Sequence, residues 1–426
     1  MDSVIGLVAM LALIAAGAPI FVSLGVVALV MIAFEGRPLL DAAATSIAGI
    51  NSTTFLAVPF FVMAATFMQS GGIARVIIEA AEAWVGHFRG GLALVCVIAT
   101  TLFAAISGSS VVTAMAMGTF LIPAMIARGY DRPFSLGVVG AAGTLGILIP
   151  PSLSMILYGL VAEQSVPRLF LAGVVPGLIQ AAILAAWALF YSRRKNYASG
   201  ERLGRQEFIR RNLRALPALA IPLSVFGGIY TGYATVTEAA GVAAIASLLV
   251  ALLVYREIKP NQIFGLVTEA VKSASAVTFI VIFALLFAHW ITGSGIPTML
   301  VNTAVSLDLE AWQFLLALNV IMLVMGMFLD AIAVLLIVTP IALPLLGPLG
   351  IDPVHFGIVL IVNMEIAFLT PPIGLNLFVL SSISRAPLSD AVRGVWPFVA
   401  LMFAFLLLIT YVPEISLWLP SLIYGR

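Results

Sequence analysis

One internal repeat constrains this chain of 426 residues more than any other feature of its sequence. A shift of 221 residues superimposes Pro123, Gly129, Asp131, Pro150, Pro151, Gly173 and Pro176 on Pro344, Gly350, Asp352, Pro371, Pro372, Gly394 and Pro397, in that order. Apolar residues coincide by chance in any hydrophobic chain, but a proline pair with shared flanking breaks at one offset does not. We infer that the chain consists of two copies of one half-unit.

The composition places both copies in a membrane. Hydrophobic residues make up 62% of the chain and charged residues 9%, which leaves too few polar side chains to cover a soluble globule. Apolar stretches close to the length that crosses a hydrocarbon core of about 30 Å recur from end to end. The single cysteine, Cys96, excludes an intramolecular disulfide. The first apolar run lacks the basic region of a secretory signal, so we expect it to be retained.

Glycine, proline and charge divide each half into the same series of elements. We expect spanning segments, an amphipathic stretch, two short arms forming a re-entrant hairpin, a helix broken at the Pro-Pro pair, and a last crossing. In the first half the spanning segments lie near 4–18, 19–34 and 42–70, and the amphipathic stretch lies near 74–88. The hairpin arms lie near 90–106 and 110–127, the broken helix near 134–162 and the last crossing near 168–191. In the second half the spanning segments lie near 215–230, 236–254 and 263–291, and the amphipathic stretch lies near 296–306. The hairpin lies across 311–346, the broken helix near 354–384 and the last crossing near 395–418. Residues 4–34 could form one helix or two, and the split of the second copy at 231–233 favours two.

If each hairpin returns to its own side, each half crosses the bilayer five times and the second copy is inverted. The predicted fold is an all-α polytopic membrane protein of two inverted repeats, 1–191 and 215–426, joined by a linker at 192–214. That linker carries eight basic residues, which places it in the cytoplasm. Counting outwards puts 17 of the 20 basic residues on the same side and leaves Arg37, Arg168 and Arg426 outside. Both termini are then external, the first hairpin opens from the cytoplasm, and the second opens from outside.

Four breaks should meet near the bilayer midplane, where transporters built from inverted repeats bind substrate and ions. They are the hairpin tips at 107–110 and 326–330 and the helix breaks at 149–152 and 370–374. Proline stops the helical ladder and frees carbonyl groups that can face a cation, and sodium suits such hard oxygen ligands. This predicts one sodium site in each half. The predicted ligands are Ser107, Gly108, Ser109, Ile149 and Ser152 for the first site, and Gly326, Asp330, Thr370, Gly374 and Asn376 for the second.

Asp330 is the most informative single residue, because a carboxylate near the bilayer centre costs about 2.5–3.5 kcal/mol on insertion scales. It can contact the substrate or cap the helix that starts at Ala331, and the two roles are compatible. We predict a substrate site formed by Asp330 with Ser109, Ser110 and Ser152. The alternatives are that the serines only ease helix packing and that the proline pairs are only kinks.

Three further ionisable residues lie within apolar segments. Glu238 opens a helix after Thr237 and is expected to be structural, since acids favour helix N-termini. Glu365 lies inside the second broken helix, and its role is undecided. His289 ends an apolar run and is expected to be interfacial or packed. No lysine or arginine lies in the four breaks, so helix N-termini, hydroxyl groups and bound sodium would have to neutralise an acidic substrate.

The sequence also resembles a known family over essentially its whole length. The resemblance rests on the runs 227–232 with 237–240, 107–110, 326–330 and 369–376. These runs are similar to those of the large membrane subunit of tripartite ATP-independent periplasmic (TRAP) transporters, the DctM-like permease. That family often has Thr-Pro-Thr-Glu-Ala where this chain reads Ala-Thr-Val-Thr-Glu at 234–238.

The resemblance implies a sodium-driven, elevator-type importer of organic acids, such as C4-dicarboxylates, keto acids or sialic acids, in the bacterial inner membrane. It implies two partners, a small four-helix membrane subunit and a soluble periplasmic substrate-binding protein. It also divides each repeat into scaffold helices (1–88 and 215–306) and a moving hairpin with its broken helix (90–163 and 311–384).

A stand-alone sodium-coupled dicarboxylate or citrate carrier of the same fold is the alternative. An ATP-driven pump and an intramembrane protease fit less well, since neither a phosphate-binding loop nor an H-E-x-x-H motif occurs. The net charge of +1 gives no reason to expect nucleic-acid binding, and no enzymatic activity is expected. The sequence leaves a channel open.

Overall fold

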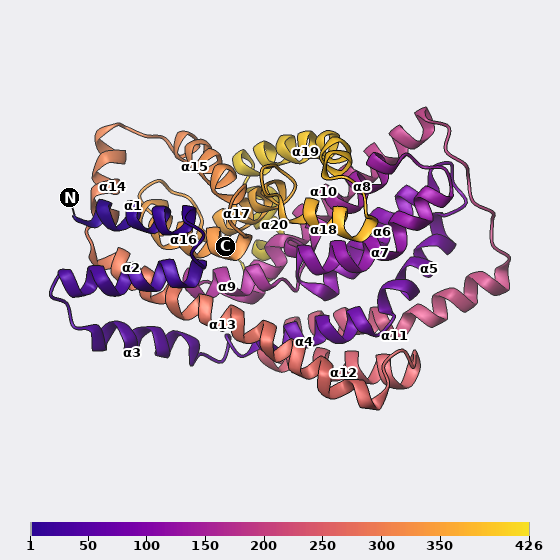
Figure 1. The fold of residues 1–426 in the computed structure, drawn as a ribbon, viewed down its shortest axis with the longest axis horizontal. Coiled ribbons are helices and arrows are strands. Elements are labelled where there is room, and N and C mark those ends of the chain that lie inside the picture. The colour runs from indigo at the N-terminus through magenta and orange to yellow at the C-terminus, as the bar shows by residue number, and fades with distance from the viewer. Residues whose placement is uncertain (1, 426) are drawn as a thin grey trace.

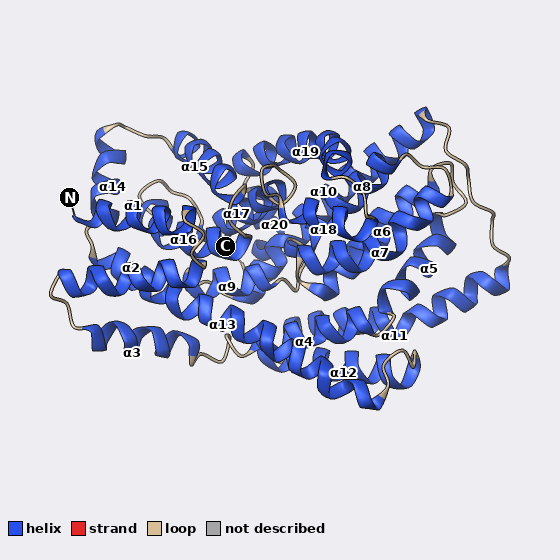
Figure 2. Ribbon diagram, viewed as in Figure 1, coloured by secondary structure: helices blue, strands red, loops and turns tan. Residues whose placement is uncertain are grey.

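A computed structural model describes residues 2–425, and Met1 and Arg426 lie outside the described residues. The described chain consists of helices joined by short loops, with an isolated β-bridge between Arg89 and Ser199 (Figure 2). Six of its helices are long and apolar enough to cross a membrane by themselves, or seven if the bent pair α4–α5 counts as one span. Eight further apolar helices of the described chain have 10–17 residues, which is short for a complete crossing.

The helices of the first half follow the expected order. They are α1 (Asp2–Ala15), α2 (Ile20–Phe34), α3 (Leu39–Ile50), α4 (Ala57–Ser70), α5 (Ile73–Val85), α6 (Gly91–Ser107), α7 (Ser110–Ala127), α8 (Arg132–Thr144) with the 3₁₀ turn η1 (Leu145–Ile147), α9 (Leu153–Val161) and α10 (Val166–Arg194). Residues 4–34 therefore form two helices, as favoured from the sequence, because the chain turns at residues 16–19.

The second half repeats this order. Its helices are α11 (Arg205–Tyr230), α12 (Val236–Leu249) continued by the π turn η2 (Val250–Val254), the turn η3 (Pro260–Gln262), α13 (Ile263–Gly293), α14 (Ile296–Ser306), α15 (Ala311–Gly326), α16 (Ala331–Leu346), α17 (Pro353–Ala367), α18 (Leu375–Ser384), α19 (Leu388–Tyr411) and α20 (Glu414–Tyr424). A shift of 221 residues moves α7 to 331–348, onto α16, and α9 to 374–382, onto α18. The Pro150–Pro151 bond before α9 and the Pro371–Pro372 bond before α18 are both cis.

The prediction of one continuous segment at 42–70 is wrong. The structure has two helices there, α3 and α4, separated at residues 51–56, whereas their counterpart α13 is unbroken over 31 residues. The break contains Asn51-Ser52-Thr53-Thr54, whose short polar side chains compete for backbone hydrogen bonds. Ser52 Oγ accepts from the Phe55 N–H at 3.1 Å, and the Thr53 carbonyl accepts from the Thr237 hydroxyl at 2.5 Å.

Two other boundaries also differ from the prediction. The last crossing, expected at 395–418, ends at Tyr411, and α20 begins after Pro413. Proline restricts the residue before it to extended backbone, and Val412 has φ −125° and ψ 79°. At the other boundary, α11 begins at Arg205, so the basic linker expected at 192–214 is helical at both of its ends.

The helices form two groups, with α3, α13, α4 and α12 along the lower edge of Figure 1 and α7, α8, α18 and α19 above them. In one group, α13 packs against α2, α3 and α4, and α12 packs against α4. In the other, α8 packs against α7 and α19, and α18 packs against α7. Of the amphipathic helices, α5 contacts α4 and α6, and α14 contacts α13 and α16.

Ion pairs gather at the end of the molecule that holds α5 and the linker, on the right of Figure 1. They are Arg75–Glu257 (3.4 Å), Arg128–Glu82 (2.5 Å), Arg211–Glu82 (2.8 Å), Arg214–Glu79 (3.6 Å) and Lys195–Asp131 (3.1 Å). The Tyr197 hydroxyl and the Lys195 ammonium lower the pKa of Asp131. The pairs Arg37–Glu35 and Arg168–Asp352 join residues that the charge pattern assigns to the other side.

Candidate functional site

The first hairpin tip lies directly against the first helix break. The Leu153 N–H donates to the Gly108 carbonyl at 3.2 Å, which joins the α6–α7 tip to the start of α9. Gly108 has φ +62°, and a Cβ placed on it would lie 2.8 Å from the Pro151 carbonyl oxygen. Only glycine accepts both the left-handed backbone and the close approach of another chain segment.

Gly108→Ala is therefore expected to separate the tip from the break, because both the positive φ and the Pro151 carbonyl oppose a Cβ. We expect uptake to fall about tenfold or more, in line with a backbone strain of 1–3 kcal/mol. Because the sequence predicts a sodium-driven importer, the measurement is uptake under an inward sodium gradient by equal amounts of folded protein. Gly129→Ala is the matched control, since Gly129 has φ +81° but nothing within 4 Å of its missing Cβ. Equal uptake by the two variants would remove the contact from the mechanism.

Hydroxyl groups and carbonyl groups line the first tip. Thr113 Oγ1 donates to the Ser109 carbonyl at 2.7 Å and is also hydrogen-bonded to Ser107 Oγ. The Thr113 N–H donates to the same carbonyl at 3.0 Å. The Ser109 carbonyl is thus already occupied, which leaves the hydroxyl of Ser109 as its available ligand atom. Thr113 was not predicted, although it lies one helical turn after Ser109.

Ser152 and Ile149 lie in the break itself, and both are buried. The Ser152 hydroxyl donates to the Ile147 carbonyl at 2.6 Å, and Ser152 is the residue that precedes α9. Its oxygen lone pairs therefore stay free to accept from, or coordinate, another group. The structure thus brings four of the five residues predicted for the first sodium site together near the contact between Gly108 and Leu153: Ser107, Gly108, Ser109 and Ser152. Ile149 lies in the same break, and its side chain lies next to Gly177 of α10.

The second tip meets the second break in a similar way. The Ile373 N–H donates to the Met327 carbonyl at 3.3 Å, and a Cβ on Gly326 would lie 2.5 Å from the Cβ of Ala367. The Thr370 hydroxyl donates to the Ile366 carbonyl at 2.8 Å. Gly374, with φ +51°, ends the break and is followed by α18.

Asp330 caps the N-terminus of α16. This is one of the two roles predicted for it, the other being a substrate contact. Its Oδ1 accepts from the Ala333 N–H at 2.7 Å. The side chain is only partly buried, so the same carboxylate can still reach a ligand at the tip. The cap accounts for one of the two carboxylate oxygens.

A side-chain hydrogen bond crosses from one half to the other. Asn376 Nδ2 donates to Ser110 Oγ at 2.7 Å, and both side chains are buried. Asn376 Oδ1 is also buried and has no hydrogen-bond partner among the described residues. Ser110 and Asn376 were predicted to serve separate sites, whereas the structure places them in contact. The repeat pairs each tip with the break of its own half, so it carries no signal for this contact.

The three remaining ionisable residues have defined environments. Glu238 forms a capping box with Thr235, since its Oε2 accepts from the Thr235 N–H at 2.7 Å. His289 Nε2 lies 3.3 Å from an Arg37 guanidinium nitrogen, so it is a packed histidine as expected. Glu365 is completely buried and accepts from Gln180 Nε2 at 2.5 Å. Gln180 was not predicted.

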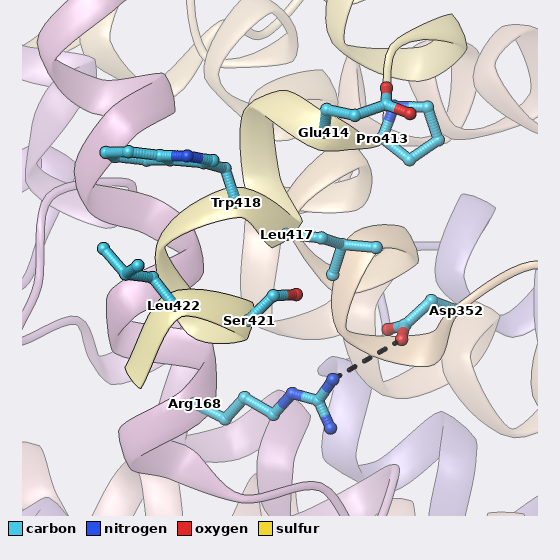
Figure 3. Close-up of a pocket in the computed structure, with 8 residues that line it drawn as sticks. All are labelled: Arg168, Asp352, Pro413, Glu414, Leu417, Trp418, Ser421 and Leu422. Atoms are coloured by element: carbon cyan, nitrogen blue, oxygen red, sulfur yellow. Dashed lines mark ion pairs between the residues drawn. The ribbon is translucent and has the colours of Figure 1, made fainter. Parts of the chain in front are cut away.

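A cavity of about 540 Å³ lies away from these breaks, where α10, α17 and α20 begin (Figure 3). Arg168 points across it to Asp352, at 3.9 Å, and Trp418 and Glu414 line its other wall. The nine residues of α9, about 13 Å of helix, separate Ser152 from this end of α10. Among the described residues no group of three or more His, Cys, Asp or Glu side chains could hold a metal ion. A cation at the breaks would therefore need mainly hydroxyl, amide and carbonyl oxygens.

Comparison with known protein families identifies the class of protein. Residues 7–415 match the family model described as the tripartite ATP-independent periplasmic transporter, DctM component. The chain belongs to the DctM family of TRAP transporters. It is therefore a multi-pass membrane permease and not an enzyme, as predicted from the sequence.

Individual relatives agree with this family. The chain is 44% identical over 368 residues to the C4-dicarboxylate TRAP transporter large permease protein DctM of Pseudomonas aeruginosa, covering 86% of each chain. It is 39% identical over 405 residues to the isethionate TRAP transporter permease protein DctMQ of Oleidesulfovibrio alaskensis, covering 94% of this chain and 64% of that one. The crystal structure of the Alcanivorax borkumensis YdaH transporter has a similar fold, with a TM-score of 0.66, 14% identity and 87% coverage of each chain.

Proposed function

We propose that this chain is the large transmembrane subunit of a sodium-coupled TRAP transporter, which imports an organic acid delivered by a periplasmic binding protein. The substrate class is a C4-dicarboxylate, a keto acid or a sialic acid. The P. aeruginosa relative, named for C4-dicarboxylate, favours the first of these classes. The observation that carries the proposal is the contact of Asn376 with Ser110, which joins a hairpin tip of one half to a helix break of the other and leaves a buried amide oxygen unpaired.

Inverted repeats are part of this proposal. The order of helices in the second half follows that of the first at one offset, apart from α20 and the break between α3 and α4. Every ion pair among the described residues joins groups that the charge pattern assigns to one side of the membrane. Such an arrangement supports a cytoplasmic linker and, with five crossings in each half, periplasmic termini.

The polar groups at the breaks suit an acidic substrate only together with a cation. Helix N-termini at Ser110, Leu153 and Leu375 supply backbone N–H groups near the breaks, and the hydroxyl of Ser109 adds a donor. The Ser152 hydroxyl already donates to the Ile147 carbonyl, so it offers its lone pairs to a cation. Asp330 adds a negative charge, which opposes an anionic substrate unless sodium is bound. Bound sodium supplies the compensating positive charge, so coupling to sodium is an electrostatic requirement as well as a source of energy.

The moving part would comprise the two hairpins with their broken helices, 90–163 and 311–384, and the scaffold would comprise 1–88 and 215–306. The dense contacts of α7 with α8 and α18, and of α12 and α13 with α4, support two such groups. The amphipathic helices α5 and α14 are suited to link them, because each contacts a member of both groups.

Partner subunits complete the system. The O. alaskensis relative is named as a single permease protein, DctMQ, and this chain covers 64% of its length. We propose that a separate small four-helix membrane subunit supplies the corresponding remainder here, and that a periplasmic protein supplies the substrate. The runner-up is a stand-alone carrier of the same fold.

Reconstitution in proteoliposomes tests this function. With an inward sodium gradient, the small subunit and substrate-loaded binding protein, we expect saturable uptake that stops when either sodium or the binding protein is omitted. Uptake that persists without any binding protein would instead favour the stand-alone carrier. Flux that neither saturates nor depends on sodium would indicate a channel and contradict the proposal.

The link between the halves should appear as a coupling between two residues. Ser110→Ala leaves the Asn376 amide without its partner, at a cost of about 1–3 kcal/mol, so the sodium concentration for half-maximal uptake should rise about 5- to 150-fold. Asn376→Ala should have a similar effect, and the double variant should be no worse than either single variant. Thr119→Ala, which removes an exposed hydroxyl from the same helix, is the matched control. Strictly additive effects would contradict a shared site.

A further inference from the structure

Glu365 and Gln180 form an isolated polar pair inside the protein. Glu365 lies near the end of α17 and Gln180 near the middle of α10, and neither side chain is exposed. Gln180 Nε2 donates to Glu365 Oε2 at 2.5 Å. This is the only hydrogen bond that joins either side chain to another described residue. The repeat contains no second copy of this pair. The shift of 221 residues aligns Glu365 with Thr144 and Gln180 with Leu401.

Each of the two side chains has one unpaired oxygen. Glu365 Oε1 and Gln180 Oε1 are buried, and neither has a hydrogen-bond partner among the described residues. Both groups are planar forks, and one arm of each is used in the bond between Nε2 and Oε2. The two arms that remain are both oxygens, and an ionised carboxylate offers no proton to either of them. Two unpaired buried oxygens of this kind cost about 1–3 kcal/mol each.

No positive charge compensates an ionised Glu365. The ion pairs among the described residues do not include it. Helices α15 and α16 pack against α17 and have no ionisable side chain between their first and last residues, although Asp330 caps α16. The other ionisable side chains on α17 and on the helices packed against it are Asp352, His355, Tyr158, Arg168, Tyr191, Arg193, Arg194, Asp390, Arg393, Tyr411, Glu414 and Tyr424. The basic members lie near helix ends, and Arg168 faces Asp352, about 20 Å along α17 from Glu365.

We propose that Glu365 is protonated on Oε1 and donates that proton to Gln180 Oε1, which makes the pair a proton-binding site. One added proton then satisfies both orphan oxygens, as in the cyclic pair of a carboxylic acid with a primary amide. The pair gains a second hydrogen bond and carries no net charge. A neutral acid also removes the cost of a carboxylate in an apolar interior.

The pair lies close to both helix breaks. Gly177, one turn before Gln180, packs against Ile149 of the first break, since its missing Cβ would lie 2.7 Å from that side chain. Glu365 precedes Thr370 of the second break by five residues. The protonated pair therefore joins α10 to α17 between the two breaks, and it keeps a permanent negative charge away from the groups proposed to hold cation and substrate. This inference does not depend on sodium coupling.

Infrared spectroscopy of the full-length protein in lipid tests the protonation directly. At neutral pH the wild-type protein should show the carbonyl stretch of a protonated carboxyl group, and Glu365→Gln should lose that band. Gln180→Leu should shift the band, because the carboxyl group loses both hydrogen bonds. Asp330→Asn serves to assign any band that arises from Asp330. If Glu365→Gln removes only carboxylate bands, Glu365 is ionised and the proposal is overturned.

A comparison of substitutions provides a second measurement. A glutamine at 365 can form the same two hydrogen bonds with Gln180, so Glu365→Gln should keep the yield of folded protein and its uptake within about twofold of wild type. Glu365→Ala leaves both arms of Gln180 unpaired and should lower the yield of folded protein by about fivefold or more. If Glu365→Gln is as damaging as Glu365→Ala, the negative charge is what matters, and the proposal is overturned.

Discussion

Asp330→Ala is expected to reduce uptake to near background, a loss of about 10- to 150-fold, while the protein still inserts in the membrane and assembles with its partners. A hydrogen bond to a charged group contributes about 1.5–3 kcal/mol, and each 1.4 kcal/mol is a factor of ten. Loss of the cap on α16 adds about 1 kcal/mol of destabilisation, which leaves most of the protein folded. The measurement is sodium-driven uptake in proteoliposomes containing equal amounts of folded transporter.

Asp330→Asn separates the two roles of this residue. Asparagine caps a helix about as well as aspartate, so this variant should fold normally and still lose uptake. Asp352 is a matched control, because it caps α17 by accepting from the Val354 and His355 N–H groups but lies outside the four breaks. Asp352→Asn should therefore transport at close to the wild-type rate. Normal uptake by Asp330→Asn would reduce Asp330 to a helix cap and remove it from the substrate and sodium sites.

Gly394→Ala is expected to disrupt the packing of α19 against α8. A Cβ on Gly394 would lie 1.8 Å from the Pro133 carbonyl oxygen, and a Cβ on Gly137 would lie 2.1 Å from the Gly394 carbonyl oxygen. The backbones of α8 and α19 thus touch, and no side chain can move away to make room. Overpacking of this kind costs about 1–3 kcal/mol or more, so the melting temperature of the purified protein should fall by several degrees.

The control for this substitution is Gly241→Ala in α12. Gly241 is also a helical glycine, but nothing lies within 4 Å of its missing Cβ. Alanine at this position should leave the melting temperature unchanged or raise it, since alanine is favoured over glycine in helices by about 1 kcal/mol. A similar melting temperature for the two variants would show that α8 and α19 do not depend on direct backbone contact.

Most helix boundaries could be read from the sequence because they coincide with residues that change backbone geometry. Glycine at 108 and 374 takes a positive φ, and the proline pairs at 150–151 and 371–372 stop the helical ladder. The boundaries that were missed depend on weaker signals. At residues 51–54, four polar side chains end α3, although the surrounding segment is apolar enough to suggest one continuous helix.

The sequence was enough to establish an all-helical membrane protein and to single out the residues at the tips and breaks. It predicted the contact of each tip with the break of its own half, because the repeat preserves local spacing. The bond from Asn376 to Ser110 and the pair of Glu365 with Gln180 span 266 and 185 residues, and they became apparent only from the folded chain. Such contacts depend on how two different helix pairs cross, and side-chain spacing along one helix carries no information about that crossing.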